Sequence, residues 1–357
     1  MKKIRVGSIG IGGISRGVHL PGIAKSPDLE VAAVCDIRPE ALEFAQRAYG
    51  VKKECCFEKY EDLICCPEVD AVDISTPNRF HFEMAMAAVK AGKPYAVEKP
   101  MTMDPAQAEK LAAATREAGV KSMVCFSYRY KSAARYMRDL IRKGTLGRIY
   151  HIDMEYYQAW GLPLFGTPKV WRFDKAQAAS GALGDLGSHG LDLVRFVTGH
   201  GYTRVTGHTG TFTDARPDPV TGGMSTVDVD DFSNAMAEMD DGTAVTFRIT
   251  RFAYGRGNYQ MMEVYGEKGA LIYTLDENGQ GQDSLRVCLE PLGRDNQQFE
   301  TVRVPGRYRA DQMQSFADLL LGRGDGLTAD VGDGLRNMRD VDAVLRSAAS
   351  GSWQRVE

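Results

Sequence analysis

The 357-residue sequence has few cysteines and no pattern that would join them. Its seven cysteines include two adjacent pairs, Cys55-Cys56 and Cys65-Cys66, but no C-x-x-C motif. An odd number with this spacing argues against a disulfide framework. A four-thiolate zinc site is an alternative, but the side chains of adjacent residues diverge. We therefore expect reduced thiols and no bound metal.

The chain also lacks long apolar runs and an excess of positive charge. No stretch approaches the roughly 18 uninterrupted apolar residues of a membrane span. The formal net charge is -3, so no basic field is available to hold nucleic acid or an anionic membrane. The apolar segment 3–9 is too short and too glycine-broken for a signal peptide. We expect a buried first strand and a cytoplasmic protein.

The length and the hydrophobic pattern predict two domains, residues 1–126 and 127–357. The first alternates short β-branched runs with capped helices, which is typical of an α/β, doubly wound parallel sheet of the Rossmann type. The second has long strand-like runs and three helices, which predict an α+β domain with a large, mostly antiparallel open sheet. The segment 214–225, rich in Pro, Gly and Asp, is expected to be an exposed loop.

A glycine-rich turn follows the first predicted strand. Gly10, Gly12 and Gly13, with Ile14 and Ser15, lie where that strand gives way to a helix. The first glycine permits the tight turn, and the second lets the backbone approach a pyrophosphate at the helix N-terminus. Ser15 stands at the third position of the fingerprint, where glycine is usual. This pattern predicts a dinucleotide site.

Asp36 ends the second predicted strand, where an acidic residue usually binds the adenosine ribose. A carboxylate there accepts hydrogen bonds from the ribose hydroxyls and repels a 2′-phosphate. Arg38 is the complication, because a guanidinium accommodates that phosphate. We expect NAD as the cofactor, with NADP second. Ser75, Thr76, Pro77 and Asn78 leave the third predicted strand at the edge where such sheets bind ligands; Asn78 is a candidate helix N-cap or a cofactor contact.

Lys99 lies between Glu98 and Pro100 at the end of a buried strand. Lysine is seldom buried without a purpose, and a lysine beside an oxidised nicotinamide would have a lowered pKa. Such a group can relay a proton near neutral pH. We interpret Lys99 as a candidate catalytic residue.

Asp185 and His189 lie four residues apart where a glycine-rich turn enters a helix. At this spacing their side chains share a helix face, and Asp192 follows on the same side. Such a polar cluster on an otherwise apolar helix is hard to explain by packing. A metal site built from these three residues is an alternative, but no further ligands are obvious nearby.

Four motifs together resemble the Gfo/Idh/MocA oxidoreductases, over essentially the whole chain. They are Gly10-x-Gly12, Thr76-Pro77-Asn78-x-x-His81, Glu98-Lys99-Pro100 and the segment 181–192. The resemblance implies a Rossmann domain, a second domain whose open sheet often packs on another subunit, and NAD(P)-dependent oxidation or reduction of sugars and cyclitols. It also maps the catalytic lysine, aspartate and histidine onto Lys99, Asp185 and His189.

Three aromatic clusters are expected to line a substrate cleft between the domains, and each also fits a core or interface role. These clusters supply four candidate substrate-binding residues. Four more come from the motifs described above: Lys99, Asp185, His189 and Asp192. Trp171 and Arg172 are also candidate cofactor contacts, with His81, Glu98 and Lys99. The residues that the clusters contribute are Arg129, Tyr157, Trp160 and Arg172.

The sequence therefore predicts an NAD-dependent sugar or cyclitol dehydrogenase. In this hypothesis His189 is the general base, Lys99 polarises the substrate oxygen, and Asp185 orients the imidazole of His189. A redox-assisted glycosidase on the same scaffold is the alternative, and a non-catalytic NAD-binding sensor is a third. A large sheet with one exposed face predicts a homodimer or homotetramer.

Overall fold

The computed structural model describes residues 2–277, 282–290 and 297–357. By their internal contacts these residues form two compact units. The Rossmann unit consists of Met1–Ser127 and Ala310–Met338, and the sheet unit consists of Tyr128–Arg309 and Arg339–Glu357. The division expected from the sequence, 1–126 and 127–357, differs in the segment 310–338. This segment returns to the first unit because its helix α9 (Gln312–Leu320) packs there, against α1 (Leu20–Lys25).

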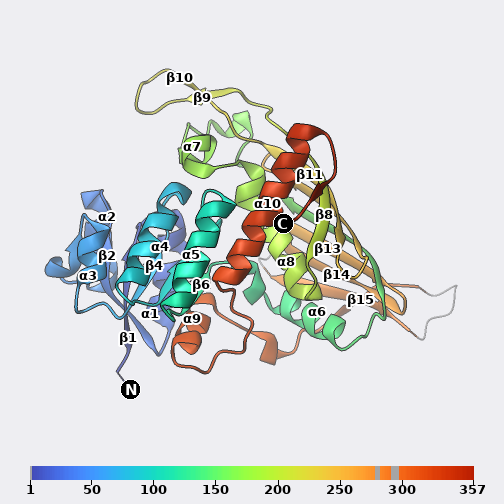
Figure 1. Ribbon diagram of the computed structural model, residues 1–357, viewed down its shortest axis with the longest axis horizontal. Helices are drawn as coiled ribbons and strands as arrows, with labels where there is room; N and C mark the ends of the chain where they lie inside the picture. The colour runs from blue at the N-terminus through green and yellow to red at the C-terminus, as the bar shows by residue number, and fades with distance from the viewer. Residues whose placement is uncertain (1, 278–281, 291–296) are drawn as a thin grey trace. The chain divides into compact units, whose positions relative to one another are not determined.

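The Rossmann unit is built on a six-stranded parallel sheet in the order β3-β2-β1-β4-β5-β6 (Figure 1). This confirms the predicted doubly wound fold. Short β3 was missed, because its two residues lie in the cysteine-rich stretch that carries no strand signal. The strands are β1 (Ile4–Ile9), β2 (Leu29–Cys35), β3 (Cys56–Phe57), β4 (Ala71–Ile74), β5 (Tyr95–Val97) and β6 (Ser122–Val124).

Helices cover both faces of this sheet, so the strands are buried on both sides. One apolar cluster joins Val6 and Ala96 of the strands to Met313 and Phe316 of α9. A second apolar cluster joins other strand residues, among them Ile74 and Val97, to four further helices. These are α2 (Pro39–Tyr49), α3 (Tyr60–Cys65), α4 (His81–Lys90) and α5 (Pro105–Glu117).

The helices of this unit begin and end with different kinds of cap, and Asn78 does not have the role of helix N-cap that the sequence offered. Asp104 caps α5, since its Oδ1 accepts a hydrogen bond from the backbone N–H of Gln107 at 2.8 Å. Gly50 ends α2 in the left-handed conformation, with φ of 69°. Asn78 is not the N-cap of α4: it opens a 3-10 turn, Asn78–Phe80, and Phe80 occupies the N-cap position.

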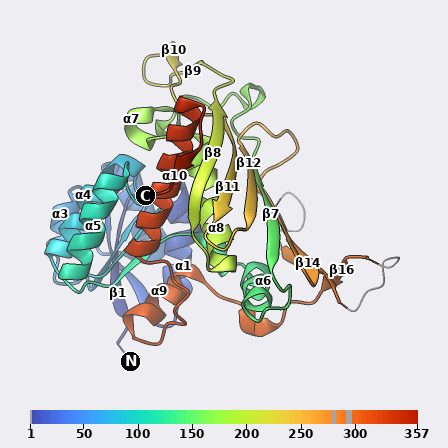
Figure 2. The same cartoon turned by 45° about the vertical axis from the view of Figure 1, so that its right-hand side comes forward.

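The sheet unit is built on nine strands in the order β16-β15-β14-β13-β7-β12-β11-β8-β17. Among the described strand pairs of this sheet, only β7–β12 is parallel, so the predicted mostly antiparallel sheet is confirmed. Figure 2 shows β8, β11, β12 and β7 side by side. The strands are β7 (Ile149–Tyr157), β8 (Tyr202–Gly210), β11 (Phe232–Met239), β12 (Ala244–Thr250), β13 (Tyr259–Gly266), β14 (Gly269–Asp276), β15 (Asp283–Leu289), β16 (Glu300–Val302) and β17 (Gln354–Arg355).

Helices lie against one face of this sheet. α8 (Ser188–Thr198) contacts β7 and α6 (Ser132–Arg142), and Val344 of α10 (Val331–Ser350) contacts Gly207 of β8. Along β11 the residues alternate, with Ala235 and Ala237 buried and Met236 exposed. One face of the sheet therefore belongs to the core, and the opposite face has exposed side chains, such as that of Met236.

The expected loop at 214–225 contains a small hairpin instead. β9 (Ala215–Pro217) pairs with β10 (Met224–Thr226), and residues 227–231 separate β10 from β11. Arg216 of β9 is buried, and so are Asp230 and Asp231 in the segment between β10 and β11. Among the described residues, no helix is both long enough and apolar enough to cross a bilayer.

Candidate active site

The turn after β1 has the shape that a dinucleotide pyrophosphate needs. Gly10 has φ of 86°, and a Cβ there would lie 2.8–2.9 Å from atoms of Thr76 and Ser75, so only glycine fits. A Cβ on Gly12 or Gly13 would meet nothing within 4 Å. These two glycines thus leave bare backbone at the start of a helix, where a phosphate group fits.

Ser15 plays a different part from the cofactor contact expected of it. It is fully buried and opens a π-helical segment, Ser15–His19, ahead of α1, whereas Ile14 before it is 37% exposed. A small residue is needed here for close packing of helix on strand, as in the glycine version of the fingerprint. Ser15 therefore supports the turn, and only its neighbours face solvent.

Asp36 and Arg38 form a closed pair at the end of β2. Oδ1 of Asp36 accepts hydrogen bonds from the backbone N–H and Nε of Arg38, both at 3.0 Å. Oδ2 accepts from the N–H of Ile11 at 2.8 Å and from Nη2 of Arg38 at 3.0 Å. Burial raises the pKa of Asp36, but these hydrogen bonds outweigh it and lower the pKa overall. Since a carboxylate offers about four lone-pair sites, ribose hydroxyls can bind only if Arg38 moves.

The turn after β4 is fixed to the glycine turn and to the Glu98-Lys99-Pro100 segment. Ser75 donates from Oγ to the carbonyl of Gly10 at 2.9 Å. The ring nitrogens of His81 lie 2.9 Å from the carbonyls of Thr76 and of Pro100. Burial is the main cause that lowers the pKa of His81, so its ring stays neutral. Because it is fully buried, His81 joins the two turns, and the direct cofactor contact expected of it is not available.

Glu98 belongs to a buried ion-pair network that the sequence did not suggest. His19 at the end of the first π-helical segment places Nδ1 2.7 Å from Oδ1 of Asp73 and Nε2 3.0 Å from Oε1 of Glu98. The other oxygen of Glu98 accepts from the backbone N–H of Lys99 at 3.2 Å, and Lys99-Pro100 is a cis peptide. Glu98 therefore holds the backbone of the candidate catalytic lysine, and His19 holds Glu98.

The charges in this network reinforce one another. Burial alone lowers the pKa of His19, but the charges of Asp73 and Glu98 and their hydrogen bonds raise it to about 10. Burial raises the pKa of Glu98, and the hydrogen bond and charge of His19 outweigh this and lower it. At neutral pH the network is thus an imidazolium between two carboxylates.

In the sheet unit, Asp185 and His189 lie on one continuous helical segment. Asp185 is in a π-helical turn, Leu183–Gly187, and His189 is in the first turn of α8. The side chain of Asp185 is 19% exposed, and its Oδ1 lies 3.7 Å from Nε of Arg172. π-helical turns inside α-helices occur often at functional sites.

The ring of His189 is held among tyrosines. Its centroid lies 4.7 Å from that of Tyr128, edge to face, and 6.2 Å from that of Tyr156. The two tyrosine hydroxyls are 2.5 Å apart. Burial raises the pKa of Tyr128 to about 12 and the pKa of Tyr156 well above its usual value, so both hydroxyls stay protonated at neutral pH.

A chain of side-chain hydrogen bonds continues from these hydroxyls. Gln158 donates from Nε2 to the Tyr156 hydroxyl and to Oδ1 of Asn258, both at 3.1 Å. Oε1 of Gln158 accepts from the indole N–H of Trp160 at 2.6 Å. Trp160 thus joins the polar surroundings of His189 through Gln158. Asn258, which the sequence analysis did not single out, belongs to the same chain of hydrogen bonds.

Arg129 and Asp192, both predicted substrate contacts, pair with each other. Nε and Nη2 of Arg129 donate to the two oxygens of Asp192 at 2.8 and 2.5 Å. Their side chains are only 6% and 3% exposed. This two-point pairing joins the segment after β6 to α8.

Comparison with known families adds a decisive observation. A model of an oxidoreductase family with an NAD-binding Rossmann fold matches residues 4–126, and a model of the GFO/IDH/MocA C-terminal domain matches residues 134–272. The chain belongs to the Gfo/Idh/MocA oxidoreductase family. The Rossmann unit is therefore an NAD-binding domain, and the glycine turn described above fits that cofactor.

Some of the similar proteins span the full chain, and others match part of it. Levoglucosan dehydrogenase of Pseudarthrobacter phenanthrenivorans is 29% identical over 100% of this chain and 99% of its own. A structure of levoglucosan dehydrogenase in complex with NADH superposes with a TM-score of 0.90 at 27% identity, covering 100% of both chains. D-glucoside 3-dehydrogenase of Escherichia coli is 30% identical over 55% of this chain and 54% of its own.

Tyr157 and the pair Trp171-Arg172, which the sequence offered as candidate site residues, lie as follows. Tyr157 lies on the face of β7 opposite to Tyr156, because successive strand residues point to opposite sides, and it stacks on Tyr259 with centroids 6.1 Å apart. Tyr156, its neighbour, faces His189 instead. Trp171 and Arg172 form a short 3-10 turn, Trp171–Phe173, with the guanidinium 4.4 Å from the indole centroid.

Proposed function

We propose that this protein is an NAD-dependent dehydrogenase that oxidises a ring hydroxyl of a sugar, glycoside or cyclitol, or reduces the matching ketone. The surroundings of His189 carry this proposal: an imidazole held edge-on to tyrosines whose hydroxyls continue into Gln158 and Asn258. Such a series of neutral donors and acceptors suits a polyhydroxylated ring. The named sugar and glucoside dehydrogenases among the relatives support the same substrate class.

The proposed roles divide between the two motifs. When bound, NAD supplies the hydride acceptor at C4 of its nicotinamide. His189 takes the hydroxyl proton as general base, and Asp185, beside Arg172, orients it or binds a neighbouring hydroxyl. Lys99 binds and polarises the reacting oxygen, with its backbone held by Glu98. Arg129 and Asp192, as a buried ion pair, are assigned to fixing the helix.

The cofactor preference proposed here is NAD over NADP. Gly10, Gly12 and Gly13 would receive the pyrophosphate, and the carboxylate of Asp36 would accept from the ribose hydroxyls. Arg38 has to leave part of its pairing with Asp36 when the ribose binds, and the preference for NAD then rests on the negative charge of Asp36, which repels a 2′-phosphate.

A panel of sugars, cyclitols and glycosides, including levoglucosan and aryl glucosides, tests this function with NAD and with NADP. Absorbance of the reduced nicotinamide and release of the aglycone are followed together. We expect reduced cofactor to accumulate with at least one ring substrate. Aglycone release without net reduced cofactor would point to a redox-assisted glycosidase, and no reaction with any compound would overturn the proposal.

A further inference from the structure

A single residue outside the helix that carries Asp185 and His189 caps its N-terminus. The backbone N–H groups of Gly181 and Leu183 donate to the two carboxylate oxygens of Asp230, at 2.6 and 2.7 Å. The N–H of Ala182, between them, donates to the backbone carbonyl of Asp230 at 2.8 Å. Three consecutive amides at the helix start thus share one acceptor residue.

This cap replaces the local one that helices normally have. The first N–H groups of a helix have no acceptors within it, and a neighbouring Ser, Thr, Asp or Asn usually satisfies them. Here the N-cap residue of the π-helical turn is Ala182, which has no side-chain acceptor. Asp230 lies just before β11, 49 residues from Gly181 in the sequence, so the cap forms only in the folded unit. Its negative charge at the helix N-terminus is also favourable to the helix dipole.

The fit between the turn and its cap is tight. A Cβ on Gly181 would lie 1.8 Å from the carbonyl oxygen of Asp230, so no larger residue fits without moving the turn. Asp230 itself is only 9% exposed. Burial is the main cause that raises its pKa, whereas the hydrogen bonds from Leu183 and Gly181 lower it. The turn and the carboxylate therefore fix each other.

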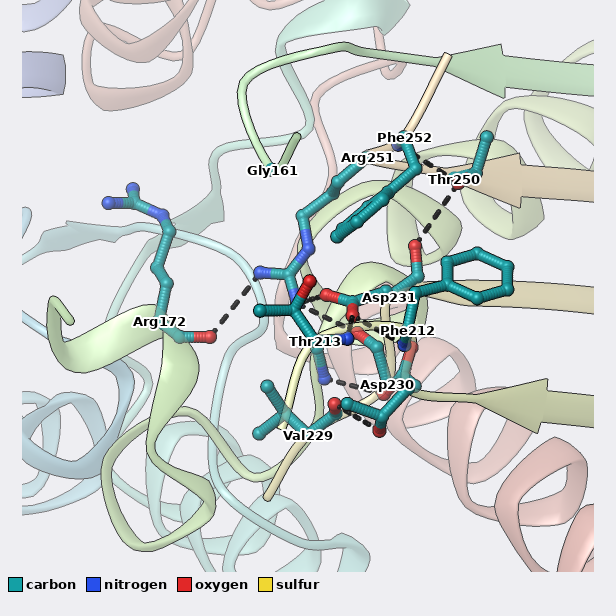
Figure 3. A network of polar contacts seen from close by, with 12 residues as sticks. Gly161, Arg172, Phe212, Thr213, Val229, Asp230, Asp231, Thr250, Arg251 and Phe252 are labelled. Atoms are coloured by element: carbon teal, nitrogen blue, oxygen red, sulfur yellow. Dashed lines mark hydrogen bonds and ion pairs between the residues drawn. The ribbon is translucent and has the colours of Figure 1, made fainter. Parts of the chain in front are cut away.

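Arg251 connects this cap to the segment that bears Arg172. Its guanidinium is fully buried and donates from Nη2 to the carbonyl of Asp230 at 2.7 Å and from Nη1 to the carbonyl of Arg172 at 3.4 Å (Figure 3). Arg172 in turn approaches Asp185 to 3.7 Å. Arg251 thus holds the backbone of Arg172, and Asp230 holds the backbone of 181–183, just before Asp185.

Asp231, the residue after Asp230, also accepts hydrogen bonds from backbone N–H groups, but from those of a different segment. Asp231 is fully buried, and its Oδ1 lies 3.6 Å from Nη2 of Arg251. Its Oδ2 accepts from the N–H groups of Phe212 and Thr213 at 2.9 and 3.2 Å, as Figure 3 shows. Asp231 therefore fixes the end of β8, whereas Asp230 fixes the catalytic turn.

We propose that Asp230 is a positioning residue: its carboxylate, supported by Arg251, sets the place and direction of the turn that presents Asp185 and leads to His189. This inference rests on the proposed function, which assigns the chemistry to those two side chains. Correct placement matters because a shift of about 1 Å can cost roughly 100-fold in rate.

The test compares Asp230→Asn with Asp231→Asn in the NADH-binding enzyme. Asparagine keeps one acceptor oxygen, but its NH₂ group replaces the other oxygen. One of the two backbone N–H groups, of Gly181 or Leu183, then faces a donor and loses its acceptor. We expect both variants to lower the melting temperature by similar amounts and to bind NADH normally. Only Asp230→Asn should lower kcat strongly, by about 10- to 100-fold, with a smaller change in the KM for the sugar. Equal kcat losses in the two variants would overturn the proposal.

Amide hydrogen exchange on the wild-type protein tests the cap even if Asp230→Asn does not fold. The N–H groups of 181–183 should exchange as slowly as those in the middle of α8; exchange at the rate of an exposed loop would contradict the cap. If none of the sugars, cyclitols or glycosides supports the reduction of NAD by the wild-type protein, the proposed function fails, and the exchange result decides on the cap by itself.

Discussion

His19 and Glu98 form a buried ion pair in the Rossmann unit, with 3.0 Å between Nε2 and Oε1. Asp73 binds the other ring nitrogen, at 2.7 Å. The free carboxylate oxygen of Glu98 then accepts from the backbone of Lys99. A residue that precedes α1 thereby supports the backbone of the candidate catalytic lysine.

This pair predicts a stability that falls with rising pH. The pKa of His19 is raised to about 10 in the folded state from 6.5 in the unfolded chain, so its contribution is complete below 6.5 and is lost as the pH rises through 10. Between these values the stability difference between wild type and His19→Gln should shrink by about 1.4 kcal/mol per pH unit. Urea unfolding at pH 7, 8 and 9 measures it.

His81 is the matched control, because it is equally buried but its pKa is lowered by burial. Both its folded and unfolded forms are neutral above pH 7, so His81→Gln should change stability by the same amount at each of these pH values. A pH-independent effect of His19→Gln would show that His19 is not an imidazolium.

Cofactor preference should depend on the Asp36–Arg38 pair. Asp36→Ser releases Arg38 and removes the negative charge, so the kcat/KM ratio of NADP to NAD should rise by about 10-fold or more. Arg38→Ala frees the lone pairs of Asp36 and should lower that ratio. Initial rates with both cofactors measure the change. An unchanged ratio in Asp36→Ser would contradict the assigned ribose site.

The two proposed chemical residues should affect turnover far more than cofactor affinity. Lys99→Ala and His189→Ala should each lower kcat by about 100-fold or more, as expected for loss of proton transfer or oxygen polarisation. The Kd of NADH, followed by its fluorescence, should stay within about threefold. Lys93→Ala is a suitable control, since Lys93 precedes the same strand, β5, and binds the carbonyl of Cys66. Near-full activity of both variants would refute the proposed roles.

Replacement by alanine should affect NADH binding at Gly13 and protein stability at Gly181. Gly13→Ala meets open space, so it should leave stability unchanged but weaken NADH binding, because the methyl occupies the place of the pyrophosphate. Gly181→Ala collides with the Asp230 carbonyl and should cost about 1–3 kcal/mol of stability. Thermal unfolding and NADH titration of each variant check both statements. Equal behaviour of the two variants would contradict the assigned sites.

The open face of the nine-stranded sheet is predicted to pair subunits. Size-exclusion chromatography with light scattering should give a mass of two or four times 39.3 kDa. Met236 on β11 is 52% exposed on this face, and Met236→Glu should shift the protein toward monomer, because it buries a charge in the interface. Met224→Glu, at a 65% exposed position in the β9–β10 hairpin, should leave the mass unchanged. A monomeric wild type would refute this assembly.

Much of the fold could be predicted because its signals are local. Strand β2 and helix α2 have the bounds that their apolar runs and their proline and glycine ends indicate. The hairpin at 215–226 could not be predicted, because the buried Arg216 that anchors it resembles, in the sequence, any arginine of a polar loop. The side of β7 on which Tyr157 lies was also undetermined without the strand register.

The sequence by itself determined the glycine turn, the Asp36 position and the motifs around Lys99, Asp185 and His189, since these depend on residue type at short spacing. Only the tertiary structure decided what holds them. His19 supports Glu98 from 79 residues away, and Asp230 caps the turn at Gly181 from 49 residues away. Buried charges must find partners in space, and such partners leave no periodic trace along the chain.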